Sequence, residues 1–331
     1  MIQIDFVIVL LSTVVSYLVT FIATKYWIRL AYRNKLVGKD MNKYKKPLIA
    51  EGGGIAVIAG ISISILVYIF FKSFVLQTTT HLIETFALLL TMLFAALIGF
   101  TDNILGWKKG LRQLPKALLT IPIAIPLIVI NAGTSQMMGI EFGLLYPLLV
   151  VPIAVMGATN GVNLLAGFNG LEAGLGIIIF SVLGIIAFMQ GESWLALIAL
   201  LIVVSLLTFL LFNKYPAKVF PGDTLTYCLG ALIACFAILG NMEKIAIILF
   251  IPFIIEGFLK LRSRFHAESF GKPNKDNSLE PLYAKIYSLT HLTIVILKKI
   301  KPSHKVYEKD VTNFLLVLEI ILALIVLIPI F

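Results

Sequence analysis

Residues 160–189 read NGVNLLAGFNGLEAGLGIIIFSVLGIIAFM, an apolar run with a polar beginning. The run over 171–189 contains Glu172 as its only charged residue and is long enough to cross a hydrocarbon layer of about 30 Å as a helix. Three asparagines and three glycines stand directly before it. Amide side chains at membrane depth are costly, so they are functional-site candidates by default. The stretch therefore predicts a membrane-spanning helix with a polar site at one end.

Apolar runs of this kind recur along the whole chain. Of its 331 residues, 60% are hydrophobic and 13% are charged, and the mean hydropathy is +1.01. Soluble domains are about 25% charged, and one soluble core of this size cannot bury so much apolar surface. The sequence predicts an all-α polytopic membrane protein, one integral membrane domain over residues 1–331, with about ten transmembrane helices. The expected spans are 4–29, 53–71, 84–101, 117–132, 145–162, 171–189, 194–212, 224–240, 245–260 and 312–331.

The positive charges are distributed unequally between the two sides that these spans define. Of the 27 Lys and Arg residues, only Lys72 and Lys244 fall on one side. The positive-inside rule then places the basic side in the cytoplasm and both termini outside. The net charge of +10 is accordingly read as an orientation signal and not as a nucleic-acid-binding surface. The loops on the basic side are 30–52, 102–116, 163–170, 213–223 and 261–311.

Polar side chains at the end of the third expected span form the first candidate cluster. Asp102 and Asn103 stand side by side there, and a carboxylate beside an amide at a helix end can cap a helix, bind a metal ion or handle a proton. Lys116 opens the next expected helix, where a cation opposes the helix dipole. This unfavourable placement indicates a functional role for Lys116.

A second cluster combines the asparagines of the opening stretch with the turn before the eighth span. Asn160 and Asn163 are three apart and share a helix face, and amide oxygens are neutral ligands for a hard cation such as Mg²⁺. Asp223 could be a helix N-cap or could complete a metal site with Asn163. Phe220 in the same turn could stack on a planar base. The alternative for the asparagines is helix–helix hydrogen bonding.

Two further segments complete the candidate site. Glu51 and Gly52 begin a run of glycines before the second span, and glycines at a helix N-terminus make a backbone that favours anions. Arg262 and Arg264 follow the ninth span and suit the bidentate capture of phosphate or sugar oxygens. Together the clusters predict a site at the cytoplasmic membrane surface for a divalent metal, a diphosphate, a planar base and an amphiphilic phosphate.

The chain resembles the polyprenyl-phosphate N-acetylhexosamine-1-phosphate transferases (glycosyltransferase family 4) over nearly its whole length. The most specific matches are NGVNLLAGFNGLEAGLG (160–176) and NKYPAKVFPGDTLTYCLGAL (213–232), with support from GFTDN (99–103) and EGGGIAVIAG (51–60). RSRF (262–265) is similar to the Arg-His-Arg-Ile segment of the eukaryotic enzymes, and the His-rich motif of the bacterial lipid I enzymes is absent. The resemblance is therefore closer to archaeal and eukaryotic UDP-GlcNAc–dolichyl-phosphate GlcNAc-1-phosphotransferases.

This resemblance implies roles for individual positions. Asn163 and Asp223 match ligands of Mg²⁺, with Mn²⁺ as the alternative. Ser263 stands where the eukaryotic enzymes have His, and Asn103 stands where the family usually has a second Asp. The resemblance also implies catalytic roles for Asp102, Asn103 and Lys116, and it places Lys116 at the lipid phosphate, with Arg112 as its rival. The implied substrate-binding residues are Glu51, Gly52, Asn160, Asn169, Phe220, Arg262, Ser263 and Arg264. Of these, Asn169 and Phe220 match the uridine contacts.

The implied reaction transfers a sugar-1-phosphate, with GlcNAc favoured, from a UDP-sugar to dolichyl or polyprenyl phosphate and releases UMP. It is the first membrane step of lipid-linked oligosaccharide synthesis for N-glycosylation, at the plasma membrane in a prokaryote. The alternative is a transporter or flippase without chemistry, which would place its substrate site near the bilayer midplane. No nucleic-acid partner is expected, and the sequence leaves a homodimer open.

Overall fold

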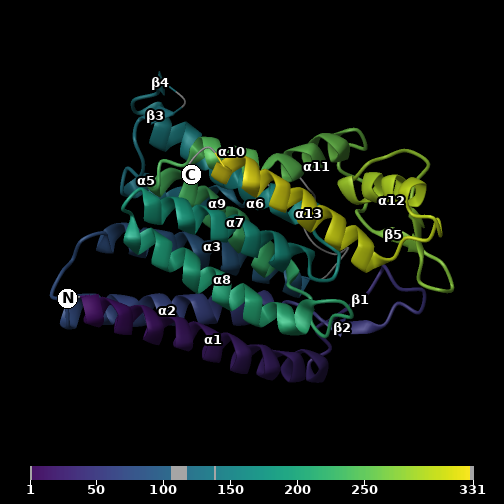
Figure 1. The fold of residues 1–331 in the computed structure, drawn as a ribbon, viewed down its shortest axis with the longest axis horizontal. Coiled ribbons are helices and arrows are strands. Elements are labelled where there is room, and N and C mark those ends of the chain that lie inside the picture. The colour runs from purple at the N-terminus through teal and green to yellow at the C-terminus, as the bar shows by residue number, and fades with distance from the viewer. Residues whose placement is uncertain (1, 106–117, 138, 329–331) are drawn as a thin grey trace.

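The computed structural model describes residues 2–105, 118–137 and 139–328. Its long helices run along a common direction and pack side by side into a bundle (Figure 1). Among the described residues, eight helices are long and apolar enough to cross a membrane, so the predicted all-α polytopic membrane fold is confirmed. The long helices are α1 (Ile2–Arg33), α2 (Gly54–Phe74), α3 (Leu82–Leu105), α6 (Val151–Leu165), α7 (Leu171–Met189), α8 (Ser193–Asn213), α9 (Gly222–Leu239) and α13 (Glu308–Leu327).

Two of the expected spans are divided into short helices. The described part of the fourth contains the 3₁₀ helix η1 (Ile121–Ala124) and α5 (Ile125–Val129), and the ninth is divided into α10 (Glu243–Leu249) and α11 (Ile251–Leu261). Prolines stand at the first or second position of η1, α5 and α11. Proline lacks an N–H, and its ring clashes with the carbonyl of the preceding turn, so it interrupts a helix. The count of ten spans therefore stays a prediction.

The connecting segments gather at the two ends of the bundle. The N-terminus, the end of α13 and the hairpin of β3 (Gln136–Met137) and β4 (Ile140–Glu141) lie towards one end (Figure 1). The antiparallel hairpin of β1 (Val37–Lys39) and β2 (Leu48–Ala50) lies at the other, which we call the basic end. The expected long loop 261–311 also lies there, and its segment 262–307, between α11 and α13, is folded. It contains the antiparallel pair β5 (Gly271–Pro273) and β6 (Leu279–Pro281) and the helix α12 (Leu289–Ile300).

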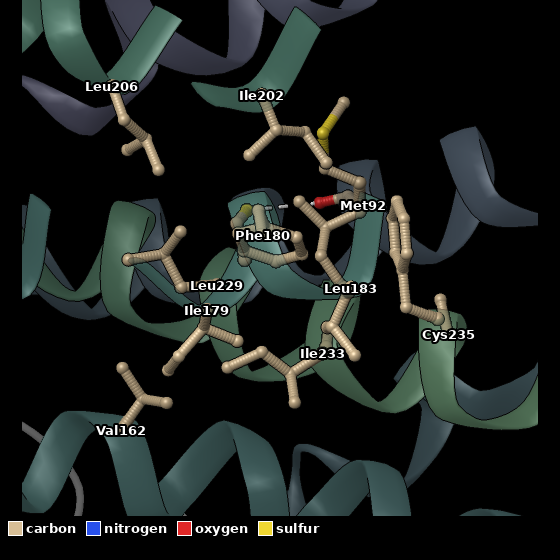
Figure 2. Close-up of a cluster of buried hydrophobic side chains, with 14 of the residues drawn as sticks. Met92, Val162, Ile179, Phe180, Leu183, Ile202, Leu206, Leu229, Ile233 and Cys235 are labelled. Atoms are coloured by element: carbon tan, nitrogen blue, oxygen red, sulfur yellow. Dashed lines mark hydrogen bonds between the residues drawn. The ribbon is translucent and has the colours of Figure 1, made fainter. Parts of the chain in front are cut away.

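The hydrophobic core surrounds α9. In the most apolar 18-residue stretch of α9, 83% of the residues are buried, compared with 22% for α1. Helix α1 exposes apolar side chains that lipid can cover. Phe180 of α7 meets Phe236 of α9 edge to face, with ring centroids 5.4 Å apart. Figure 2 shows Phe180 among Met92 of α3, Ile202 of α8 and Ile233 of α9. Four helices therefore share one core, which extends to Val162 of α6.

Two glycines bring α3 and α6 directly onto α9. A Cβ atom at Gly99 would lie 2.4 Å from the carbonyl oxygen of Asp223, and one at Gly230 would lie 2.3 Å from that of Ala158. Small residues at such crossings let helix backbones approach closely within a membrane. The ends of α3 and α6 are therefore fixed beside the beginning of α9, where the candidate polar residues lie.

Candidate functional site

The beginning of α9 is capped by the end of α3. Asn103 Oδ1 accepts hydrogen bonds from the backbone N–H of Thr224 (3.2 Å) and from its hydroxyl (2.8 Å). Gly222 has a φ of +68°, and a Cβ atom there would lie 2.6 Å from Asn103 Oδ1. Asn103 therefore satisfies a backbone donor that the helix start leaves without an intrahelical partner. This contact requires an acceptor oxygen and no negative charge.

Asp102 and Gly52 flank this capping amide. Asp102 is half-buried on α3, and a Cβ atom at Gly52 would lie 3.9 Å from Asn103 Oδ1. The start of the glycine run thus lies beside Asn103. Lys116 and its rival Arg112 lie outside the described residues, so their contact with a lipid phosphate stays a prediction.

Asn163 and Asp223 lie at neighbouring helix ends, in the last turn of α6 and the first turn of α9. The hydroxyl of Thr226 donates to Asn163 Oδ1 (2.9 Å) and approaches the backbone carbonyl of Asp223 (3.3 Å). A carboxylate, an amide and a hydroxyl supply only oxygen donors, the set that a hard cation such as Mg²⁺ prefers. No group of three or more His, Cys, Asp and Glu side chains that could hold a metal occurs in the described part of the chain. A cation here would need oxygens from a bound substrate in addition to those of the protein.

Asn160 makes a helix–helix contact. Its Nδ2 donates to the hydroxyl of Thr120 (2.9 Å), just before η1, and to the carbonyl of Met156 (2.8 Å) one turn earlier. This is the hydrogen bonding that the sequence left as the alternative for the asparagines. A substrate contact by Asn160 stays a prediction.

The glycine run before α2 is tied to the turn before α9. Gly53 donates its N–H to the carbonyl of Phe220 and Gly54 to that of Pro221, both at 2.9 Å. These amides are engaged within the protein and do not face a ligand. The expected anion-binding backbone is therefore wrong for Gly53 and Gly54, and the run serves to pack one loop against the other.

Glu51 and Phe220 are neighbours although they come from distant parts of the chain. Both lie against Gly38 of β1, where a Cβ atom would be 2.8 Å from Glu51 Oε2 and 3.5 Å from Phe220 Cδ2. Trp27 Nε1 donates to the Glu51 carbonyl (2.8 Å) and holds the loop. Burial raises the pKa of the Glu51 carboxyl. The predicted nucleotide-side glutamate and the predicted base-stacking ring thus border the same strand.

Asn169 belongs to a buried polar network that sequence analysis missed. Its backbone N–H donates to Glu308 Oε1 (2.8 Å), and its Nδ2 donates to Asp40 Oδ2 (3.3 Å). Lys43 forms ion pairs with both carboxylates, and Asn42 Nδ2 donates to the carbonyl of Gly167 (2.9 Å). The sequence signal for this network was an acid and an amide, Asp40 and Asn42, inside the basic run 39–46. The count of charges alone assigns that run to membrane orientation. We call this set the Glu308 network: Asp40, Asn42, Lys43, Asn169 and Glu308.

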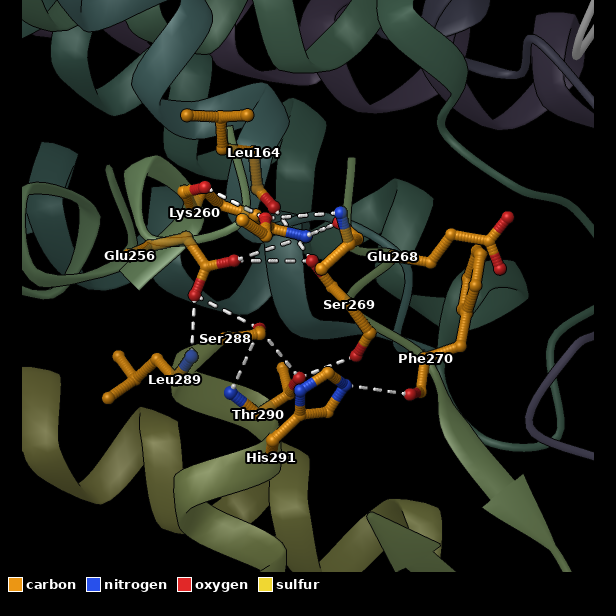
Figure 3. Close-up of polar contacts among 12 residues, drawn as sticks. Leu164, Glu256, Lys260, Glu268, Ser269, Phe270, Ser288, Leu289, Thr290 and His291 are labelled. Atoms are coloured by element: carbon orange, nitrogen blue, oxygen red, sulfur yellow. Dashed lines mark hydrogen bonds and ion pairs between the residues drawn. The ribbon is translucent and has the colours of Figure 1, made fainter. Parts of the chain in front are cut away.

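The segment after α11 is anchored by Glu256. This carboxylate accepts hydrogen bonds from Ser269 Oγ (3.2 Å), Ser288 Oγ (3.0 Å) and the backbone N–H of Leu289 (2.6 Å), as Figure 3 shows. Lys260 lies 3.6 Å from the same carboxylate. A buried carboxylate with several donors is well satisfied, so Glu256 fixes the path of the chain from α11 to α12.

The residues predicted to bind the sugar and the diphosphate form the turn that follows α11. Arg262 Nη1 donates to the carbonyl of Ile286 (3.2 Å), and Ser263 Oγ donates to that of Lys260 (2.8 Å). Arg262 and Arg264 are solvent-exposed, so their guanidinium groups are accessible to a ligand. Their contacts with a sugar or diphosphate stay predictions.

The ends of α3, α6 and α9 and the loop before α2 thus converge at one end of the bundle. This arrangement defines a polytopic membrane protein with a polar site at one membrane face. Residues 85–241 match the profile described as Glycosyl transferase family 4. The chain belongs to this family, because a relative from Saccharolobus solfataricus is 39% identical over 295 residues, 86% of this chain and 88% of the relative.

That relative carries the provisional name UDP-N-acetylglucosamine–dolichyl-phosphate N-acetylglucosaminephosphotransferase. A Sulfolobus acidocaldarius protein with the same provisional name is 32% identical, over 87% of this chain and 88% of its own length. The phospho-N-acetylmuramoyl-pentapeptide-transferase of Halalkalibacterium halodurans is also 32% identical, over 75% of this chain and 80% of its own.

Proposed function

We propose that the protein transfers GlcNAc-1-phosphate from UDP-GlcNAc to dolichyl or another polyprenyl phosphate and releases UMP. Two archaeal relatives named for this reaction support the proposal, since the similarity covers most of both chains. The observation that carries it is the convergence of Asn163, Asp223 and Asn103 at one end of the bundle. A transporter would instead favour a polar path near the bilayer midplane.

Asn163 and Asp223 are the residues that would hold a divalent cation, Mg²⁺ or Mn²⁺. Their side-chain oxygens fit such an ion, and the Thr226 hydroxyl joins Asn163 Oδ1 to the backbone carbonyl of Asp223. When bound, the cation would neutralise charge on the diphosphate oxygens of the donor and on the departing UMP. The protein supplies a neutral amide and one carboxylate, which together carry a single negative charge. The substrate oxygens would supply the rest of the negative charge around a divalent cation.

The transfer is a single displacement that depends mainly on positioning. An oxygen of the lipid phosphate attacks the β-phosphorus, the bond from that phosphorus to the bridging oxygen breaks, and UMP leaves with that oxygen. A phosphate monoester has a second pKa of about 6, so a strong base is unnecessary. Asp102 orients the lipid phosphate, Lys116 and Arg262 counter the remaining charge, and Phe220 stacks on the base.

The basic end faces the cytoplasm in this proposal. The loops there hold nearly all the Lys and Arg residues, and the opposite loops hold only Lys72 and Lys244. A nucleotide sugar made in the cytosol can then reach the site directly. In a prokaryotic cell, the protein would act in the plasma membrane.

A radiolabel assay tests the proposed reaction. Purified protein in lipid nanodiscs is incubated with UDP-[¹⁴C]GlcNAc, polyprenyl phosphate and Mg²⁺, and labelled lipid and UMP are expected in equal amounts. Asp223→Asn and Asn163→Ala are expected to lower the rate by roughly 100-fold or more, as loss of a charge-stabilising group does. Asn34→Ala, an exposed amide at the same end, is the control and is expected to keep the wild-type rate.

Two outcomes would contradict the proposal. Uptake or binding of UDP-GlcNAc without UMP release would favour the transporter. Full transfer by Asp223→Asn with unchanged Mg²⁺ dependence would remove the proposed metal residues from the site.

A further inference from the structure

Asn169 presents a single acceptor atom that the protein leaves unused. Its backbone N–H donates to Glu308, its carbonyl accepts from Thr312 Oγ1 (3.4 Å), and its Nδ2 donates to Asp40. Among the described residues, no donor reaches the remaining oxygen, Oδ1. Asn169 as a whole is 4% exposed, but its Oδ1 is not fully buried and keeps some contact with solvent.

Asp40 determines which end of the Asn169 amide is buried. Asp40 is 4% exposed, and its two oxygens have separate partners. Oδ1 accepts from the backbone N–H of Asn42 (3.2 Å), and Oδ2 accepts from Asn169 Nδ2 (3.3 Å) with Lys43 Nζ 3.5 Å away. An ionised carboxylate accepts hydrogen bonds and cannot donate them, so only the NH₂ of Asn169 can face it. The amide oxygen must therefore point the other way.

The first hairpin brings the ring of Phe220 and the Asn169 amide to neighbouring positions of the chain, Gly38 and Asp40. Phe220 lies against Gly38 of β1, and Asp40 follows two positions later, directly after the strand ends. Residues two apart on a strand face the same side at a separation of roughly 7 Å. A flat heterocycle stacked on Phe220 can therefore turn its edge towards Asn169.

We propose that Asp40 is a positioning residue that sets base selectivity. It fixes the Asn169 amide with its oxygen outward, where that oxygen accepts the ring N–H that uracil carries between two carbonyls. Cytosine presents a lone pair at that ring position, so two acceptors would face each other. The inference rests on the proposed function, because it takes the nucleotide of the sugar donor as the ligand.

Binding of UDP and CDP, measured separately by isothermal titration with Mg²⁺ present, tests the inference without requiring transfer. The wild-type protein is expected to bind UDP roughly 10- to 100-fold more tightly than CDP, the range that one unsatisfied hydrogen-bonding group produces. The ratio of the two affinities is compared within each variant, so a lower fraction of active protein does not change it.

Asp40→Asn is the decisive variant. The N–H of Asn42 keeps an acceptor at the Oδ1 position, so the new amide places its NH₂ where Oδ2 was, facing the NH₂ of Asn169. Two donors repel, and the Asn169 amide turns over to present its NH₂ to the ligand. The preference for UDP is expected to fall by at least 10-fold, with CDP gaining affinity. Asp276→Asn makes the same change at an exposed carboxylate paired with Lys305 (2.7 Å) and is expected to keep the wild-type ratio.

Asn169→Ala is the second variant, for use if Asp40→Asn does not fold. It leaves Asp40 and its other partners in place. It is expected to bind both nucleotides with nearly equal affinity. A wild-type ratio in either Asp40→Asn or Asn169→Ala would overturn the inference while leaving the proposed function standing. Wild-type protein that binds neither nucleotide would refute the proposed function and the inference with it.

Discussion

Asn103 acts as the cap of α9, and its contacts explain why an amide serves where a second acid was expected. Removing the acceptor in Asn103→Ala leaves the Thr224 donors without their partner. The variant is expected to lose about 1–2 kcal/mol of unfolding free energy, the usual effect of a lost N-cap. Asn103→Asp keeps an acceptor and is expected to unfold near the wild-type temperature. Thermal unfolding of the detergent-purified proteins measures both, and equal destabilisation by Asp and Ala would contradict the capping role.

Glu51 gives the stability of the protein a dependence on pH with a definite sign. Burial raises its pKa above the ordinary value of 4.5. The folded protein then binds this proton more tightly than the unfolded chain, so stability falls as the pH rises from about that value through the raised pKa. Glu51→Gln removes this loss. Its melting temperature is expected to gain on the wild type at pH 7 and to approach it at pH 4, and a gain that does not change with pH would argue against the buried carboxyl.

The sequence predicted Asn169 as a ligand residue but could not predict its surroundings. The residues that hold it, Asp40 and Glu308, lie 129 and 139 positions away along the chain. Periodicity and capping rules describe neighbours within a few turns, and neither sees such a pairing. For the same reason, the contact of Asn160 with Thr120 was only one of two alternatives, while the link of Asn163 to the beginning of α9 matched the predicted cluster.

The crossing of α3 and α9 is the element on which the site geometry depends most. A Cβ atom at Gly99 would lie 2.4 Å from the Asp223 carbonyl, so Gly99→Ala must separate the helices. Overpacking of this kind costs about 1–3 kcal/mol, and transfer activity is expected to fall because Asn103 and Asp223 move apart. Gly157→Ala on α6 is the control, since nothing lies within 4 Å of a Cβ there. It is expected to melt at or slightly above the wild-type temperature, because alanine favours helices.

Transfer rates and melting curves of the two glycine variants decide the point. Equal behaviour of Gly99→Ala and Gly157→Ala would mean that the crossing tolerates a methyl group, and the close approach of α3 and α9 would then not hold the site together.

Element boundaries followed from hydrophobic length wherever a helix is uninterrupted. The expected span 171–189 coincides with α7, and 194–212 differs from α8 by one residue at each end. Hydropathy could not predict the break between α10 and α11, because the residues on both sides are equally apolar and only Pro252 marks it. The fold of segment 262–307 also escaped prediction, since the partner of Ser269 and Ser288 is a carboxylate inside the preceding helix.

In the whole molecule, the basic loops and the candidate polar site lie at the same end of the bundle. The basic end collects the polar clusters, the Glu308 network and the Glu256 anchor, whereas the opposite end carries short connections such as β3–β4 (Figure 1). A lipid phosphate approaches from the membrane and a nucleotide sugar from water, so a site at one membrane face can receive both. In the proposed orientation, the same asymmetry of charge places cations where both substrates would bring negative charge.

The orientation predicts which loops an impermeant thiol reagent can reach. Thr79 between α2 and α3 and Lys275 between β5 and β6 are exposed at opposite ends, whereas the native Cys228 and Cys235 are buried and should react little. A membrane-impermeant maleimide added to intact cells is expected to label Thr79→Cys and to leave Lys275→Cys unlabelled until the cells are permeabilised. Unsubstituted protein measures the background from the buried thiols. Labelling of Lys275→Cys in intact cells, with Thr79→Cys protected, would turn the basic end outward and separate the site from cytosolic UDP-sugar.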